Sequence, residues 1–249
     1  MMIESCLLHD CVTLARLCAS AGRHARLPDR YTVQRYDLEI CGADVETTYQ
    51  VISRFSVALV RDGTDVAVGI ADLGGPVPAA DEDAYVLAAQ VWECIATELD
   101  GAGSAIVTGH GMGGAVAVWI AWWLHVRAVN TMCVTFGATA PSPGLAIRNV
   151  AQELDLIRIV NIGDTVPSES IPNAKQFGEV WNLSESGELH GDDRLHWLVG
   201  LIEWACRLLP RRWRRDRTNR PAHAIGEYVR RLELARDNSS AHELWEVVE

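Results

Sequence analysis

The residues most able to do chemistry gather at a glycine-rich turn, Gly109-His110-Gly111-Met112-Gly113-Gly114, between an apolar run and an Ala/Val/Trp-rich stretch. A buried strand that turns at once into a helix is typical of the pattern G-x-S-x-G, whose central serine attacks a carbonyl carbon. The residues that flank such a turn must be small because strand and helix approach closely, and Gly109 and Gly113 meet that need. The centre of the pattern is Gly111, so the nucleophilic hydroxyl is missing.

Glycine-rich turns after strands are also typical of phosphate and dinucleotide sites. The dinucleotide pattern G-x-G-x-x-G does not fit glycines at 109, 111, 113 and 114, and the turn has no P-loop lysine. The seven cysteines are scattered without a C-x-x-C pair, which argues against a zinc site or a disulfide framework. We therefore predict a nucleophile-type turn, no cofactor and no metal.

Two further residues are candidates for acid–base chemistry. Asp164 follows an apolar run at a glycine-containing turn, the usual place for a functional carboxylate at the carboxyl edge of a sheet, although a turn-capping aspartate fits as well. His223 follows Pro221 at the start of a helical stretch, so its ring can point back to that edge; the alternative is a surface histidine. We interpret His110 as packing or turn support.

Four segments resemble the fungal-type (class 3) lipase family. Residues 107–115 resemble its V-T-G-H-S-[LM]-G-G-A, and residues 134–137 resemble its T-F-G strand end. Residues 158–167 resemble R-x-V-N-x-x-D-x-V-P, which implies that Asp164 is the triad acid. Residues 223–228 resemble H-x-x-x-x-Y, which implies that His223 is the triad base; His190 and His196 lack that tyrosine spacing. The order of nucleophile, acid and base is that of α/β hydrolases.

The resemblance fails at the oxyanion hole as well as at Gly111. The backbone N–H of Met112, the residue after the nucleophile position, is one expected donor. The family's F-R-G-[ST] segment aligns with Gly69-Ile70-Ala71-Asp72, where the Asp72 carboxylate would repel a developing oxyanion. A second alignment, over residues 60–64, keeps Arg61 and Thr64 but places them on a hairpin turn. The family's P-R-V-G is replaced by residues 138–141, Ala-Thr-Ala-Pro.

Three hypotheses follow for the function. In the first, a lipase-like chain has lost its nucleophile, which costs on the order of a million-fold in kcat, and binds an acyl or lipid ligand or a protein instead. Natural degeneration fits this hypothesis better than an engineered change, since the oxyanion segment is altered too. In the second, the protein is an active triacylglycerol lipase or carboxylester hydrolase whose serine is replaced in this chain. In the third, an unrelated α/β ligand-binding protein carries a chance glycine cluster.

Alternating strands and helices predict a mainly parallel sheet covered by helices, the α/β-hydrolase fold, in one domain over residues 1–249. We expect a helical extension over residues 1–50 and a Trp/Arg-rich insertion over residues 192–220. A hairpin with Asp62-Gly63 at its turn joins the first two strands, and a helical stretch lies within residues 81–99. Further strands are expected at residues 104–108, 131–136 and 156–161, with a helix from the glycine-rich turn to about Arg127.

The net charge of −11 argues against a general nucleic-acid binder. Residues 207–220 form a local basic exception that fits either an anionic membrane surface, with a tryptophan at the interface, or a solvated loop beside the chain's own carboxylates. The N-terminus lacks the basic region of a signal peptide, and no apolar run reaches membrane-spanning length, so a cytoplasmic protein is expected. The membrane-surface candidates are Arg211, Arg212, Trp213, Arg214 and Arg215.

Overall fold

The computed structural model describes residues 11–21, 33–43, 49–72, 84–141, 153–168, 178–190 and 221–237. These residues form one sheet of eight strands whose spatial order follows the chain. The first three strands pair antiparallel, the third to the seventh run parallel, and the last pairs antiparallel again. The strands are β1 (Val33–Ala43), β2 (Tyr49–Asp62), β3 (Asp65–Asp72), β4 (Ser104–His110), β5 (Asn130–Phe136), β6 (Asp155–Asn161), β7 (Glu179–Leu183) and β8 (Leu189–His190).

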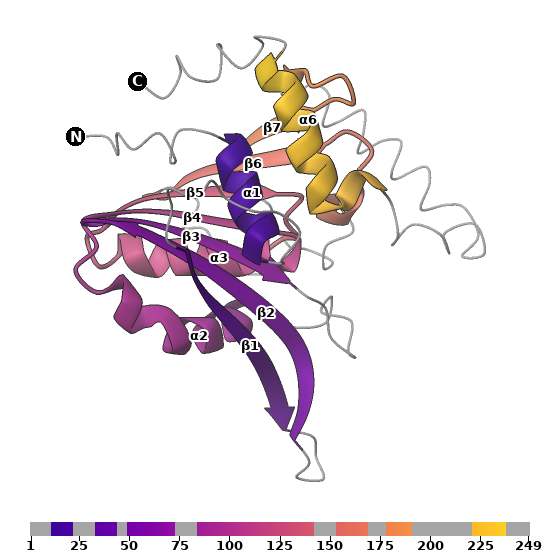
Figure 1. Ribbon diagram of the computed structural model, residues 1–249. Coiled ribbons are helices and arrows are strands. Elements are labelled where there is room, and N and C mark those ends of the chain that lie inside the picture. Colours follow the sequence, from indigo (N-terminus) through magenta and orange to yellow (C-terminus); the bar gives the residue numbers. More distant parts are fainter. Residues whose placement is uncertain are drawn as a thin grey trace.

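Helices cover both faces of the sheet (Figure 1). One face carries α2 (Ala84–Ile95) and α3 (Met112–His125), which connect successive parallel strands and therefore lie on the same side, as right-handed crossovers require. The other face carries α1 (Cys11–Ala21) and α6 (Ile225–Asp237), which come from opposite ends of the chain and contact each other. Short 3-10 turns lie at Ala96–Leu99, Val166–Ser168 and Pro221–His223.

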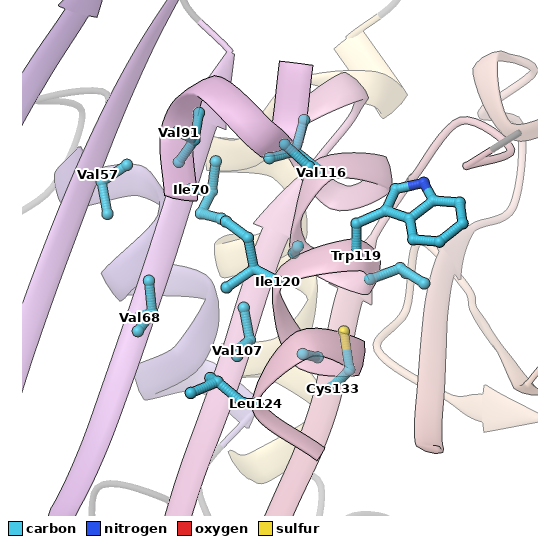
Figure 2. Packing of buried hydrophobic residues seen from close by; sticks show 14 of the residues in the cluster. Val57, Val68, Ile70, Val91, Val107, Val116, Trp119, Ile120, Leu124 and Cys133 are labelled. Carbon is cyan, nitrogen blue, oxygen red and sulfur yellow. The ribbon is translucent and has the colours of Figure 1, made fainter. Parts of the chain in front are cut away.

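The two layers of helices create two hydrophobic cores. The core on the α2/α3 side centres on α3, which is buried along almost its whole length because it lies between the sheet and α2 (Figure 2). The core on the other side joins α1 and α6 to the inward-facing residues of β4, β5 and β6. None of the described helices is long and apolar enough to cross a membrane.

The sequence predicted most of these elements. The strands and helices expected between residues 55 and 161 are confirmed, with the β2–β3 turn at Gly63-Thr64, one position later than predicted. The predicted helical extension over residues 1–50 is confirmed for α1 but wrong for β1, which is an edge strand. Tyr36 and Leu38 of β1 are partly buried against the core, but the exposed polar residues between and before them hide this strand pattern in the sequence. The short strands β7 and β8 were not predicted.

Helix α1 is an integral part of the fold. Leu17 is fully buried, and a Cβ at Gly69 of β3 would lie 2.7 Å from its Cγ. A glycine at position 69 therefore allows the helix to rest directly on the strand.

Candidate active site

The glycine-rich turn forms a sharp connection at the carboxyl end of β4. Gly111 separates β4 from α3 and has φ 58° and ψ −126°, a conformation that residues with a Cβ rarely adopt. A Cβ at Gly109 would lie 2.2 Å from the carbonyl oxygen of Gly113, and a Cβ at Gly113 would lie 2.6 Å from that of Ile70. The predicted reason for these two glycines, close approach of strand and helix, therefore agrees with the contacts.

Backbone hydrogen bonds hold Gly111 in place. Its N–H donates to the carbonyl oxygen of Phe136 at 3.2 Å. Its carbonyl oxygen accepts from the N–H groups of Gly114 at 3.1 Å and Thr139 at 3.2 Å. The segment after β5 thus clamps the turn from a neighbouring strand.

Asp164 lies just after β6, and its carboxylate is fully buried. Its Oδ2 accepts hydrogen bonds from the Tyr228 hydroxyl at 2.6 Å and from His223 Nδ1 at 2.8 Å, and its Oδ1 accepts from the Val166 N–H at 2.9 Å. Burial by itself raises the pKa of Asp164, but the three hydrogen bonds and the adjacent imidazole lower it more, so the pKa lies below its ordinary value. The group is therefore an ionised carboxylate at neutral pH.

His223 lies between Asp164 and the glycine-rich turn. Its Nδ1 contacts the carboxylate, while its Nε2 lies 3.4 Å from the position that a Cβ on Gly111 would occupy. A hydroxyl carried on that Cβ would come within hydrogen-bond reach of Nε2. The structure thus brings Gly111, Asp164 and His223 together from three separate segments of the chain.

His110 packs against His223. Its Nε2 donates to the carbonyl oxygen of His223 at 2.6 Å, and the centroids of the two rings are 4.5 Å apart. These contacts agree with the supporting role predicted for this residue.

Tyr228 and Gly137 complete the surroundings of the carboxylate, and neither residue was assigned a role from the sequence pattern. The Tyr228 hydroxyl donates to Asp164 and accepts from the Asn161 N–H at 3.1 Å, which ties α6 to the end of β6. Burial and the nearby carboxylate raise the pKa of Tyr228 well above its ordinary value. Gly137 has φ 53°, and a Cβ there would lie 2.6 Å from both Asp164 Oδ2 and the Tyr228 hydroxyl. The H-x-x-x-x-Y spacing and the T-F-G strand end were the signals available for these two residues.

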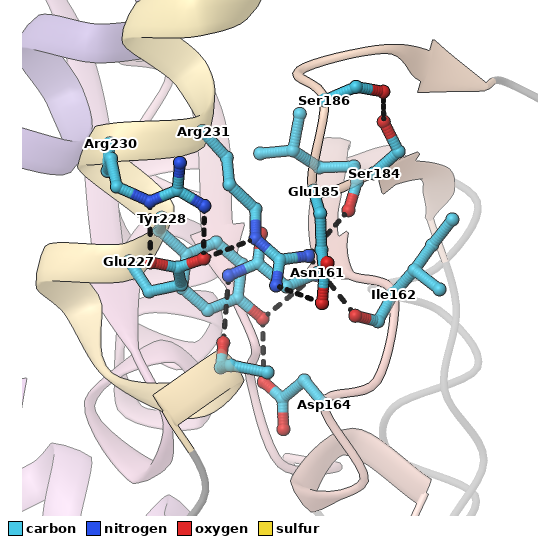
Figure 3. A network of polar contacts seen from close by, with 12 residues as sticks. Asn161, Ile162, Asp164, Ser184, Glu185, Ser186, Glu227, Tyr228, Arg230 and Arg231 are labelled. Atoms are coloured by element: carbon cyan, nitrogen blue, oxygen red, sulfur yellow. Dashed lines mark hydrogen bonds and ion pairs between the residues drawn. The ribbon is translucent and has the colours of Figure 1, made fainter.

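A second polar network anchors α6, the helix that follows His223 (Figure 3). The buried Arg231 guanidinium donates to the carbonyl oxygens of Ile162 at 3.1 Å and Leu183 at 3.2 Å, and to Glu227 at 2.7 Å. Hydrogen bonds from Arg230 and Arg231 lower the pKa of Glu227 to about 2. These contacts fix the amino end of α6 against β6 and β7 and so hold His223 at the sheet edge.

Asp72 ends β3 one residue beyond the pair Ala71–His110, which places it next to the glycine-rich turn. It lines a cavity of about 410 Å³ together with His110 and the first residues of α6. The alternative alignment of the oxyanion segment is wrong, because the Thr64 carbonyl accepts from the Gly103 N–H at the opposite, amino end of β4. Met112 begins α3 and is buried.

The residues predicted to meet a membrane surface are not among those that the structure describes. The membrane-surface candidates, Arg211, Arg212, Trp213, Arg214 and Arg215, lie outside the described residues. Across the described ranges, no group of three or more His, Cys, Asp or Glu side chains is arranged to hold a metal ion.

A family model described as "Lipase (class 3)" matches residues 45–174, slightly more than half of the chain. The chain belongs to the class 3 lipase family. The match includes the glycine-rich turn and Asp164, whereas His223 lies beyond it and is placed by the structure alone. Together with the mostly parallel sheet, the family confirms the predicted α/β-hydrolase fold.

Several solved lipase structures are similar to this chain at low sequence identity. The lipase of Rhizopus microsporus var. chinensis is 17% identical with a TM-score of 0.42, over 60% of this chain and 61% of that one. The nonglycosylated LIP2 lipase of Yarrowia lipolytica is 14% identical with a TM-score of 0.47, over 69% and 77%. The triacylglyceride lipase of Rhizomucor miehei is 15% identical with a TM-score of 0.44, over the same shares. This chain therefore spans less than two thirds of the Rhizopus enzyme, and no curated protein matches its sequence.

Proposed function

We propose that this chain is a lipase-like α/β-hydrolase that lacks its nucleophile and binds an acyl or ester ligand without turning it over. The observation that carries the proposal is the position of Gly111. Gly111 has the positive φ of the sharp turn, and a Cβ built on it would lie 3.4 Å from His223 Nε2. A glycine nevertheless offers no hydroxyl to that nitrogen.

The chemistry of the site explains why one missing oxygen would matter. With a serine at position 111, His223 Nε2 would take the hydroxyl proton while the oxygen attacked the ester carbonyl, and the same imidazole would then protonate the leaving alcohol. Without the hydroxyl, water would have to attack directly, with His223 as its base. Loss of a triad nucleophile lowers kcat by about a million-fold, so we expect binding without useful turnover.

Asp72 adds independent support to the proposal. An oxyanion hole needs hydrogen-bond donors where negative charge develops. The end of β3 instead carries the Asp72 carboxylate next to the glycine-rich turn. Its negative charge would repel the oxyanion that develops in the transition state of ester hydrolysis. The elbow side of the site thus departs from hydrolase chemistry at two positions.

The test combines labelling, turnover and binding with the purified full chain. We expect no labelling by a fluorophosphonate, no hydrolysis of short- or long-chain p-nitrophenyl esters, and saturable binding of a fluorescent fatty acid. Gly111→Ser is the matched variant, and we expect it to become labelled at a low rate. Robust hydrolysis by the unmodified chain that disappears in His223→Ala would overturn the proposal, and so would failure to bind any acyl probe.

The intact Asp164–His223 pair favours one alternative, an active triacylglycerol lipase or carboxylester hydrolase whose serine is replaced in this chain. Under that alternative, Gly111→Ser alone restores an ordinary kcat, on the order of 10 per second. Under the proposal, the Asp72 carboxylate keeps the activity of that variant far below this value.

A further inference from the structure

A cavity of about 410 Å³ lies between α1, the ends of β3 and β4, and the start of α6. Its wall includes Cys18 and Ala71, which both belong to the hydrophobic core on the α1/α6 side of the sheet. None of the described residues that line this α1/α6 cavity is Gly111, Asp164 or His223. The cavity is therefore a separate space beside the candidate active site. Its volume lies within the range of about 300–1,000 Å³ that is usual for sites of small organic molecules.

Small residues keep the α1/α6 cavity open where it meets α6. Ala224 and Gly226 line it, and a Cβ on Gly226 would have no atom within 4 Å. Glu233 lies about two helical turns after Gly226 and forms an ion pair with Arg16 of α1 at 2.5 Å. Position 226 is therefore on the face of α6 that is turned towards α1, and a side chain added there would extend into the cavity.

The described wall of the cavity carries a carboxylate but no lysine or arginine. The carboxylate belongs to Asp72, at the carboxyl end of β3. The Cys18 thiol is neutral, because burial raises its pKa to about 12, and it shares a hydrogen bond with the Thr108 hydroxyl at 3.2 Å. His110 directs its Nε2–H to the carbonyl oxygen of His223. The charge that a ligand would meet at Asp72 is therefore negative.

The amino end of α6 acts in the opposite direction, because the amino terminus of a helix favours an anion. Its effect corresponds to about half an elementary charge, which is less than the full charge of the Asp72 carboxylate. The net charge of the whole chain, −11, also attracts cations. Electrostatics therefore favours a cationic ligand over an anionic one in this cavity.

We propose that the α1/α6 cavity binds a small amphiphilic amine, with its ammonium group at Asp72 and its apolar body against Ala224 and Ile225. An ammonium group supplies three N–H donors together with the counter-charge. A carboxylate accepts several hydrogen bonds at once, so Asp72 can accept from the ligand as well as from the protein. The carboxylate that opposes an oxyanion would thus recognise a cation. This inference does not rest on the proposed acyl ligand, because the cavity lies apart from Gly111.

The first test measures binding of n-octylamine and 1-octanol to the full chain by isothermal titration calorimetry at pH 7. We expect octylamine to bind about 10- to 100-fold more tightly than octanol, because a hydrogen bond to a charged group adds that much. Asp72→Asn should remove this preference. Glu93→Gln is the matched control, because Glu93 is an exposed carboxylate of α2, on the other face of the sheet. Equal affinities of octylamine for the unmodified chain and Asp72→Asn would overturn the proposal.

A second pair of variants tests the location of the ligand. Gly226→Trp should fill the cavity and weaken octylamine binding at least tenfold, whereas Gly226→Ala, which adds one methyl group, should keep it. Binding of a fluorescent fatty acid should be unchanged in both variants, which separates this proposal from the proposed function. Unchanged octylamine binding in a folded Gly226→Trp chain contradicts the site.

Crystals soaked in 6-bromohexylamine provide a direct readout that does not depend on any variant. An anomalous bromine peak inside the α1/α6 cavity, with the ammonium group at Asp72, supports the proposal. A bromine peak only at another place, or no peak at a concentration that saturates binding in solution, overturns it.

Discussion

The two sides of the candidate site meet at Gly111 but differ in how completely they are built. On the acid–base side, made of Asp164, His223 and Tyr228, the Asp164 carboxylate accepts three hydrogen bonds. On the elbow side, made of Gly111, Met112 and Asp72, position 111 carries no hydroxyl, and the Asp72 carboxylate lies at the end of β3 beside the turn.

This difference shows which parts of a hydrolase site also serve the fold. The acid–base side joins β6, α6 and the segment after β5, so its buried polar groups would be left without partners if any member were removed. The serine of an elbow has no such structural duty and is held in a strained backbone conformation. A chain released from catalysis can therefore lose the nucleophile without loss of stability, whereas the acid–base side must stay.

The largest expected effect comes from rebuilding the elbow side. We expect Gly111→Ser combined with Asp72→Ser to hydrolyse p-nitrophenyl esters about 100- to 1,000-fold faster than Gly111→Ser alone, since one obstructed oxyanion donor is worth that much. Steady-state kcat values of the two variants give the ratio. Equal values would mean that Asp72 does not impair the elbow side.

The next effect concerns the packing of the acid–base side. Gly137→Ala places a Cβ 2.6 Å from Asp164 Oδ2 at a positive φ, and we expect a loss of about 4 kcal/mol from strain and overpacking together. Gly63→Ala is the control, because Gly63 has a similar φ of 58° but nothing within 4 Å of its Cβ position. That control should lose only about 1 kcal/mol. Urea unfolding measures both, and equal losses would show that the acid–base side tolerates displacement.

A smaller effect tests the strain on the elbow side. We expect Gly111→Ala to lower the free energy of unfolding by about 1–3 kcal/mol, because its φ is 58°. Gly226→Ala in α6, where no atom lies within 4 Å of the Cβ position, should instead stabilise the chain by about 0.5–1 kcal/mol. Thermal unfolding of the two variants compares the signs. A stabilising Gly111→Ala would contradict the view that glycine relieves strain there.

The smallest expected effect is a change in stability at acidic pH when Asp164 is replaced. The folded-state pKa of Asp164 lies below its ordinary value, so its contribution to stability is present above the unfolded pKa of about 3.9 and is lost as pH falls through the folded pKa. The stability gap between the unmodified chain and Asp164→Asn should therefore be constant near neutral pH and shrink below about pH 4. Urea titrations across this range measure the gap. A gap that is independent of pH would show that the carboxylate is not the charged partner of His223.

Much of the site was predictable because its signals are local. The turn at 109–114 follows a buried strand directly, so the glycine spacing alone indicates a strand-to-helix connection that Gly111 completes. Asp164 stands at the end of a strand, where parallel topology collects functional groups. Edge strand β1 was not predicted because its pattern of exposed polar residues resembles that of a loop.

What the sequence determined by itself is the chemical inventory: a glycine at the centre of the turn, a carboxylate, an imidazole, and the strands and helices that carry them. Only the tertiary structure decided which of these groups meet. The contacts of His223 with Asp164 and with the space above Gly111 join residues that are 59 and 112 positions apart. The physical reason is that hydrogen bonds and burial depend on distance in space, whereas sequence patterns report only the preferences of neighbouring residues.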